Sequence, residues 1–404
     1  MTEATQTGTC PHFPFSNGRP VELEPEYIEF RRDRPVARVE LPYGGEAWLL
    51  TRMAEVKEFL GDTRFSRQAM KGFSPRYTEA PIADEGGLPM MDGAQHLRTR
   101  RLLNKAFSRR RVETLRPAVT AIVNDLVDAM EAGERPVDLV AEFGNAIPRE
   151  VNCLLLGVPS EDWSRLGRLV DDVIHQGVIP QEQLIASWTE LTGYFMTMIK
   201  DRRTTPTEDL ISEMIQARNG EDVFADEEVM MNAVVVFVAG YETTACQIVN
   251  MICALLRDPD QMKWLGENLD ALPQAVEELL RYVPLTAAGV MPSIAAEGAE
   301  IGGVPISAGE AVYTCVVSAN RDEEVFTEPE KLNLRRGDEV NQHVAFGAGP
   351  HYCLGASLAR VELQVALEAV LRRMPGIRLA IPEAELPLKD GLVLRGFEQF
   401  PVVW

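Results

Sequence analysis

The sequence predicts one domain that is mainly α-helical and carries small β-sheets. From about residue 96 to residue 281, apolar residues recur every three or four positions, which is the period of an amphipathic helix. After Arg281 the pattern changes to short apolar runs between glycines, which is typical of strands and loops. No repeat, low-complexity run or linker-like stretch divides the chain. We therefore expect residues 1–404 to form a single domain.

The predicted elements follow one another in a clear order. Residues 36–40 and 46–50 flank Tyr43-Gly44-Gly45 and predict a hairpin. The long apolar segment 229–256 predicts a helix that Asp226 caps and that ends near Arg257. Strands are expected within 301–306 and 309–317, and a last helix from about 354 to 373.

The apolar segment 229–256 is long enough to raise the question of a membrane span. It contains Glu242 and several amides, and a charge near the middle of a span is costly. A buried core helix is therefore the expected structure. Residues 1–18 show no basic region followed by an apolar run, so we expect no secretory signal and a cytoplasmic protein.

Composition excludes some classes of function. The net charge of −21 and the pI near 4.8 argue against nucleic-acid binding, which favours a basic surface. The six cysteines are scattered without a CxxC pair, so neither a disulfide framework nor a zinc ribbon is expected. The chain also lacks a phosphate-binding glycine loop or dinucleotide fingerprint.

The strongest local signal is the segment 346–355, Phe-Gly-Ala-Gly-Pro-His-Tyr-Cys-Leu-Gly. It brings Cys353 to the first turn of a helix, where the dipole and free N–H groups favour a thiolate. Gly349 and Gly355 would let the backbone approach a flat cofactor. The alternatives are a buried inert cysteine, or a zinc site with His351 that lacks two further ligands.

A second signal lies inside the long apolar helix, at Ala239-Gly240-Tyr241-Glu242-Thr243-Thr244. A glycine followed by hydroxyl residues predicts a local opening of the helix. A buried acid and alcohol could relay protons there. The alternative is a polar pair that neighbouring helices satisfy.

Two further pairs lie at helical spacing. Glu278 and Arg281 are three residues apart, and His96 and Arg100 are four apart, so each pair shares one helix face. Taken alone, such pairs are usually solvated and contribute little.

Together these four motifs resemble those of cytochromes P450. Segment 346–355 matches the pattern FxxGxxxCxG at every fixed position, and the others match AGxET, ExxR and HxxxR. The resemblance covers nearly the whole chain and is nearest to actinobacterial enzymes of secondary metabolism, including those that couple aromatic rings. It implies the P450 fold, a haem b cofactor and a monooxygenase.

The resemblance also implies roles for individual residues. Cys353 would be the thiolate ligand of the haem iron, which favours O–O cleavage. Glu242 and Thr243 would deliver protons, and Gly240 would leave room for dioxygen. The other expected haem-binding residues are Ala239, Phe346, Gly347 and Gly355 beside the ring, and His96, Arg100 and His351 at the propionates.

Two structural expectations follow from the same comparison. Arg336 would complete a buried triad with Glu278 and Arg281 that supports the cysteine loop. Ser293 occupies a position where the family commonly carries a propionate-binding arginine. We therefore expect the haem to be held by one cation fewer, with a propionate that is more exposed or differently bonded and available to the substrate.

The predicted substrate pocket is apolar, which suits an uncharged hydrophobic ligand. Its candidate residues come from the loop before His96, the long helix and the stretch after Arg281: Met90, Met91, Val234, Phe237, Val238, Ala287, Ala288, Gly289, Val290, Ser293 and Val393. We expect an aromatic or polycyclic natural product, such as a Trp-containing cyclic dipeptide or a polyketide. Hydroxylation and oxidative coupling both remain open.

Since no electron-transfer domain is fused, electrons are expected from a ferredoxin and its reductase, with NAD(P)H as donor. Lys105, Arg109, Arg110 and Arg111 form a candidate docking patch for an acidic ferredoxin, or a merely solvated basic turn. The alternative function is a haem-binding sensor or carrier without turnover, and more distantly a haem-thiolate isomerase or dehydratase.

Overall fold

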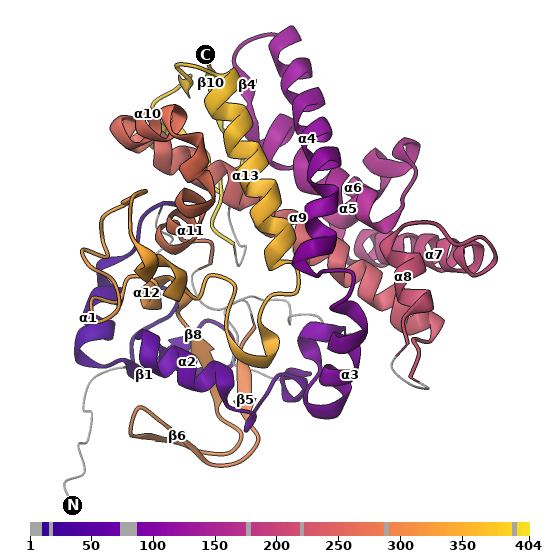
Figure 1. Ribbon diagram of the computed structural model, residues 1–404. Helices are drawn as coiled ribbons and strands as arrows, with labels where there is room; N and C mark the ends of the chain where they lie inside the picture. The colour runs from indigo at the N-terminus through magenta and orange to yellow at the C-terminus, as the bar shows by residue number, and fades with distance from the viewer. Residues whose placement is uncertain are drawn as a thin grey trace, which may run out of the picture.

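The apolar segment 229–256 forms part of one helix, α9 (Asp226–Arg257), that crosses the molecule (Figure 1). The computed structural model describes residues 10–15, 19–72, 87–174, 179–218, 222–286, 291–389 and 394–404. α9 is long and apolar enough to cross a membrane, but 56% of its most apolar window is buried inside the protein. The expectation of a core helix is confirmed.

The predicted cap of α9 is wrong by one residue. Ala225 is the capping residue, and its backbone N–H donates to the Glu228 carboxylate (2.8 Å). Asp226 instead lies in the first turn, where it accepts a hydrogen bond from Arg203 (2.7 Å). A carboxylate three residues into the helix satisfies the free N–H as well as a capping side chain would.

The other described helices are α1 (Pro25–Asp33), α2 (Met53–Gly61), α3 (Gly93–Leu103), α4 (Arg109–Ala132), α5 (Ala146–Leu156), α6 (Trp163–Ile174), α7 (Gln181–Thr204), α8 (Leu210–Gln216), α10 (Pro259–Glu267), α11 (Leu272–Tyr282), α12 (Val316–Ala319) and α13 (Ala356–Arg373). Of these, α5, α6, α7, α8, α10 and α13 pack directly against α9. The mainly helical class is confirmed.

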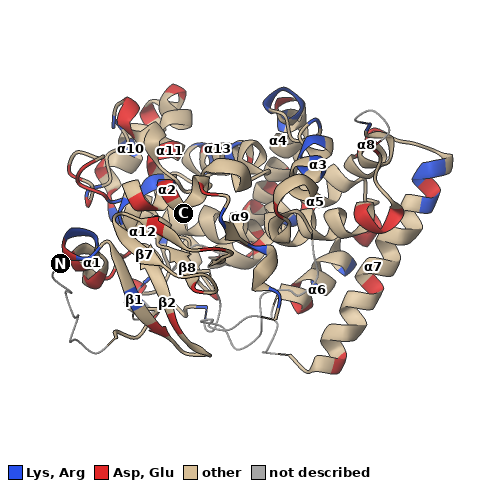
Figure 2. Cartoon of the chain, turned by 90° about the horizontal axis from the view of Figure 1, so that it is seen from below, with Lys and Arg blue, Asp and Glu red and all other residues tan. Residues whose placement is uncertain are grey.

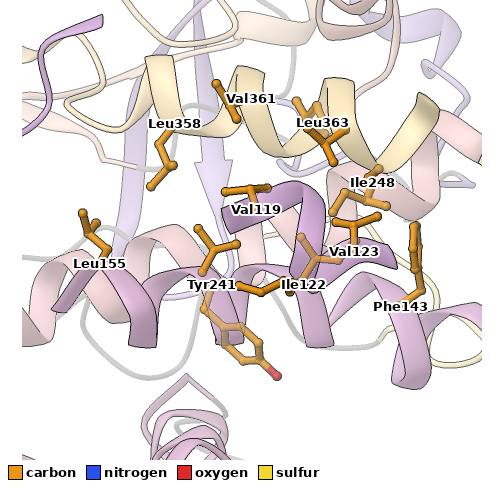
Figure 3. Close-up of a cluster of buried hydrophobic side chains, with 14 of the residues drawn as sticks. Val119, Ile122, Val123, Phe143, Leu155, Tyr241, Ile248, Leu358, Val361 and Leu363 are labelled. Carbon is orange, nitrogen blue, oxygen red and sulfur yellow. The ribbon is translucent and has the colours of Figure 1, made fainter. Parts of the chain in front are cut away.

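A large part of the core lies between α4, α5, α9 and α13. Side chains such as Val119 and Val123 of α4, Ile248 of α9 and Val361 of α13 are fully or almost fully buried there (Figure 3). These positions follow the helical period of the sequence, so each helix presents one apolar stripe to its neighbours. This packing holds α13, and the cysteine loop before it, against α9.

In the described part of the chain the strands form three small sheets, of order β1-β2-β8-β5-β3, β4-β10-β9 and β6-β7. Their bounds are β1 (Val36–Leu41), β2 (Gly45–Leu50), β3 (Phe65–Ser66), β4 (Val137–Asp138), β5 (Ser293–Ala295), β6 (Ala299–Ile301), β7 (Val304–Ile306), β8 (Ala311–Thr314), β9 (Arg378–Leu379) and β10 (Pro401–Val403).

The strand predictions near the N-terminus and after Arg281 are confirmed. β1 and β2 form the expected antiparallel hairpin, from Val36 opposite Leu50 to Leu41 opposite Gly45. β4 was not expected, because it interrupts the helical part of the chain. Its partner β10 lies at the other end of the sequence, so no local period could predict the pairing.

Candidate active site

Cys353 lies between a short 3₁₀ turn, η7 (Gly349–His351), and the start of α13. The loop closes on itself, because the backbone N–H of Cys353 donates to the carbonyl of Phe346 (2.9 Å). Gly347, at the turn, adopts a φ of +74°, which favours glycine. The structure therefore places this cysteine two residues before Gly355, the N-cap of α13, and not in the first turn of the helix as predicted.

The environment of the Cys353 thiol differs from that of the other cysteines, all six of which are described. Cys353 is exposed and Cys10 partly so, whereas the rest are buried: Cys153, Cys246, Cys253 and Cys315. Although this side chain is accessible to solvent, the protein atoms packed around it raise the pKa of Cys353 by desolvation. The N–H groups of Gly355 and Ala356 and the charges of Arg100 and Arg360 lower it, but by less. A bound metal cation would supply the further charge that a thiolate needs.

One glycine of the loop is needed for packing within the protein, which the sequence did not predict. A Cβ at Gly349 would lie 2.2 Å from the Leu60 carbonyl oxygen, so this glycine allows contact with the end of α2. A Cβ at Gly355 would meet only the Cys353 sulfur, at 4.0 Å. This packing contact accounts for Gly349, and the approach of Gly349 and Gly355 to a cofactor stays a prediction.

His96 and Arg100 lie one turn apart on α3, beside the cysteine loop. The rings of His96 and His351 are 4.2 Å apart, and His351 Nε2 lies 3.7 Å from Asp92 Oδ1. Burial, then the neighbouring His351 and Arg100, lower the pKa of His96 to about 4, so His96 is neutral at pH 7. The structure thus brings together the three predicted propionate-binding residues.

This donor set fits the haem that the motifs imply. His96 Nε2 is buried without a hydrogen-bond partner. No side-chain hydrogen bond or ion pair of Arg100 is found among the described residues. A carboxylate group of the cofactor would satisfy both, while Cys353 would face the metal. The zinc alternative is not supported, because the described residues contain no group of three or more His, Cys, Asp or Glu able to hold a metal ion.

Ser293, at the start of β5, is buried, with 4% of its surface exposed. It lines a pocket of about 110 Å³ with His96, His351 and Asp92. Arg67 lines the same pocket and was not identified from the sequence. The sequence provides little indication of Arg67 as a site residue, because Arg67 belongs to no motif and the other residues of this pocket are distant in the chain.

The cysteine loop is tied to α11 by Glu277, another residue that sequence reasoning missed. Glu277 accepts hydrogen bonds from Arg360 (2.7 and 2.8 Å) and lies 2.9 Å from His343 Nε2. Arg360 also lies over the Phe346 ring, 4.5 Å from its centroid. Phe346 is therefore held by the helix that follows the loop, consistent with its predicted position.

The predicted triad is present one residue further along α11. Glu278 accepts from Arg281 at 2.7 and 2.8 Å and from Arg336 at 2.9 Å. Their exposed fractions are 0%, 2% and 4%. Both guanidinium groups also donate to backbone carbonyls in 320–331. The triad therefore stabilises the chain that leads to the cysteine loop.

The acid and the alcohol of α9 lie in different environments. Glu242 is buried, whereas Thr243 is half-buried and donates to the carbonyl of Ala239 (2.7 Å). The expected opening of the helix is not observed, because α9 is a continuous α-helix through these residues. The Thr243 hydroxyl donates its hydrogen bond to a carbonyl of the previous turn, so the hydroxyl is satisfied while the backbone hydrogen bonds of the helix stay intact.

Gly240 has a structural reason of its own. A Cβ there would lie 3.1 Å from both polar atoms of the Asn152 amide, on α5. Asn152 in turn donates to the Phe237 carbonyl (3.4 Å). Close contact between α5 and α9 therefore explains this glycine, and room for dioxygen stays a prediction.

Glu242 has a partner that the sequence did not reveal. Its carboxylate lies 2.9 Å from Lys389 Nζ, and the side chains are 9% and 14% exposed. Burial alone would lower the pKa of Lys389, but the Cys246 thiol and Glu242 raise it overall. The sequence offered one indication of a role for Lys389, which is its position four residues before Val393, a predicted pocket residue.

The predicted substrate residues fall into three groups. Met90, Met91 and Val238 are half-buried, whereas Val234 and Phe237 are buried in the core. The Phe237 ring packs edge-to-face on Phe195 of α7, 6.4 Å away. Val234 and Phe237 are therefore corrected to core residues, because the exposed side of α9 carries Ala239. Outside the described residues lie Ala287, Ala288, Gly289, Val290 and Val393.

The candidate docking patch lies at the end of α3 and the start of α4, where Figure 2 shows Lys and Arg. Lys105, Arg109 and Arg110 are exposed. Arg111, however, donates to Glu213 of α8 (3.0 Å), so its charge is already neutralised. The patch is thus smaller by one cation than the sequence predicts.

Comparison with protein families and curated proteins gives consistent results. The family model described as cytochrome P450 matches residues 42–375. The mycinamicin IV hydroxylase/epoxidase of Micromonospora griseorubida is 42% identical, over 97% of this chain and 98% of that protein. The nocardicin C N-oxygenase of Nocardia uniformis subsp. tsuyamanensis is 41% identical, with the same coverage.

Solved structures agree. The mixed-function P450 MycG superimposes with a TM-score of 0.93 and 41% identity, covering 98% of this chain and 100% of the other. HinD, solved with NMFT and NO, superimposes with a TM-score of 0.88 and 40% identity, with the same coverage. Both curated relatives above are named for oxygenation reactions, so the comparisons support an enzyme and not a carrier without turnover.

Proposed function

Because this chain belongs to the cytochrome P450 family and is a P450 monooxygenase with a haem b cofactor, we propose that residues 1–404 form one haem-thiolate domain with Cys353 as the iron ligand. The observation that carries the proposal is the Cys353 thiol itself. It lies just before the start of α13, exposed, with the N–H groups of Gly355 and Ala356 and the charge of Arg100 acting on it.

The residues around the loop would hold the rest of the cofactor. His96, Arg100 and His351 would bind the propionates, since they lie together with unused hydrogen-bonding capacity. Phe346, Gly347, Gly355 and Ala239 would border the ring. The haem, when bound, supplies the iron at which dioxygen is activated.

Glu242 and Thr243 would supply protons from α9. Thr243 presents a hydroxyl on the half-buried side of the helix, and its proton is held at the Ala239 carbonyl. Glu242 lies on the adjacent side, held by Lys389. A carboxylate with a flexible ammonium partner can exchange a proton with water and pass it inward, which is the role of a general acid. Gly240, which has no side chain, would leave space beside them on the surface of α9.

The substrate would be a hydrophobic natural product, aromatic or polycyclic, such as a Trp-containing cyclic dipeptide or a polyketide. Met90, Met91 and Val238 support an apolar and adaptable wall. The relatives are named for mycinamicin IV and nocardicin C, so large secondary metabolites are a reasonable class. Either hydroxylation or oxidative coupling would follow from substrate geometry.

Electrons would reach the haem from a ferredoxin and its reductase, with NAD(P)H as ultimate donor, in the cytoplasm. The exposed Lys105, Arg109 and Arg110 are the docking residues that charge complementarity favours on this acidic chain.

The test is the absorption difference spectrum of the dithionite-reduced holoprotein with carbon monoxide. A strongly red-shifted Soret band is expected, because thiolate ligation gives this band and neutral thiol or histidine ligation does not. The same preparation, supplied with ferredoxin, reductase and NAD(P)H, should then form product from a member of the proposed substrate class. A band typical of histidine ligation would remove Cys353 from the iron and overturn the proposal.

A further inference from the structure

The segment after β3 carries a half-buried cation that forms no ion pair with a described residue. Arg67 directly follows β3, and it faces the pocket that Ser293, His96 and His351 also line. Burial lowers the pKa of Arg67 to about 10, and only Asp92 opposes this. Across the described residues, the Arg67 guanidinium makes no side-chain hydrogen bond or ion pair.

Asp92 acts on the Arg67 guanidinium only through space, because no hydrogen bond or ion pair joins the two side chains and the oxygens of Asp92 bond other groups. They accept from the Ser66 hydroxyl (2.6 Å) and from the backbone N–H groups of Gln68 (3.0 Å) and Arg67 (3.2 Å). His351 lies 3.7 Å away on the same carboxylate. A half-buried guanidinium that faces a pocket without a hydrogen-bonded carboxylate is incompletely solvated, so a further anion is expected at this position.

The pairing of β3 with β5 brings Arg67 to the same pocket as Ser293. β3 and β5 are antiparallel, with Phe65 opposite Ala295 and Ser66 opposite Ile294. The pairing ends there, and Arg67 follows Ser66 with a helical backbone at the start of the next 3₁₀ turn. Arg67 and Ser293 therefore lie at neighbouring ends of β3 and β5, and both line one pocket. An arginine at either position would thus reach the same pocket.

We propose that Arg67 binds a haem propionate and supplies the cation that is absent at Ser293. The inference rests on the haem-thiolate function proposed above. The two propionates then face two guanidinium groups, Arg67 and Arg100, with His96 as an additional donor. The expectation of one cation fewer is replaced by a cation at the end of the neighbouring strand, β3.

The experiment measures haem release from the ferric holoprotein to excess apomyoglobin. Because a charge-assisted hydrogen bond is lost, Arg67→Ala should release haem about tenfold to a hundredfold faster than the wild type. Arg67→Lys should fall between them, since it keeps the charge and loses the bidentate geometry. The reduction potential of Arg67→Ala should also fall, because an unpaired propionate stabilises ferric iron.

Two further variants make the test specific. Arg64→Ala is the matched control, because Arg64 is on the same segment, is paired with Asp62 (2.9 Å) and does not itself line the pocket; its release rate should stay within about twofold. The double variant Arg67→Ala/Ser293→Arg should return release close to the wild-type rate.

The outcomes separate this inference from the proposed function. If the wild type lacks the thiolate-type carbon monoxide band, the proposed function fails. If the wild type shows that band and Arg67→Ala releases haem at the wild-type rate, only this inference is overturned. Rapid release from Arg67→Ala that Ser293→Arg does not rescue would also overturn it, because the two positions would then not serve one propionate.

Discussion

Replacing Glu278 with glutamine tests the energetic role of the buried triad. The substitution keeps the size of the side chain and one carbonyl oxygen, but it removes the negative charge between Arg281 and Arg336. Arg336 retains Glu339, at 2.7 Å. Arg281 retains only backbone carbonyls, of Asn320, Pro329 and Lys331. One fully buried cation is therefore left without a carboxylate.

The expected loss of stability is about 3–5 kcal/mol, the usual cost of removing one partner from a buried ion pair. The figure applies because Glu278 is 0% exposed and water cannot replace it. A stability of about 5–15 kcal/mol is typical of whole domains, so the variant should lose a large fraction of its margin.

The assay is urea denaturation of the purified holoprotein, followed by far-UV circular dichroism. The matched control is Glu368→Gln, which removes an exposed carboxylate paired with Arg372 on α13 (2.8 Å) and should cost less than about 1 kcal/mol. A Glu278→Gln variant within about 1 kcal/mol of this control would refute the assignment of a structural triad.

Two other predictions concern Lys389 and Glu277. Lys389→Met removes the cation bound to Glu242, so product formed per NAD(P)H should fall several-fold while the carbon monoxide band is retained. Burial alone would raise the pKa of Glu277, but hydrogen bonds from His343 and Arg360 lower it from 4.5 to about 2. This depressed pKa contributes up to about 3 kcal/mol of stability, complete above the unfolded-state pKa and lost as the pH falls toward about 2. Glu277→Gln should therefore show a smaller loss of unfolding free energy than the wild type between about pH 6 and about pH 3.

Each of these has a simple control. Lys331→Met alters an exposed lysine, 71% accessible, and should leave the coupling of NAD(P)H to product unchanged. If Lys389→Met couples as well as the wild type, the pair is only structural. An acid dependence in Glu277→Gln that matches the wild type would show that Glu277 is not the group responsible.

Residues close together in the chain could be recognised from the sequence. Glu278 with Arg281, and His96 with Arg100, lie within one turn of one helix, so their spacing alone places them on a common face. The loop of 346–355 is likewise local, because its glycine turn and its hydrogen bonds lie within a few residues. Periodicity also predicted α9 as a core helix.

Other features depend on the rotation of one element against another. The period of α9 identifies an apolar helix but not which side faces α7, so Phe237 was assigned to the pocket and lies in the core. Gly240 was assigned to dioxygen, although its contact with Asn152 on α5 already requires a small residue. Side-chain packing across helices decides such cases.

The sequence by itself determined the helical class, the cysteine loop and the charged pairs, because each is encoded by short-range spacing along one element. Only the tertiary structure brought Lys389 to Glu242, Glu277 to Arg360, and Arg67 to the pocket that Ser293 lines. Each of these contacts joins segments that are distant in the chain. Strand register and helix packing determine them, and both depend on the whole fold rather than on neighbouring residues.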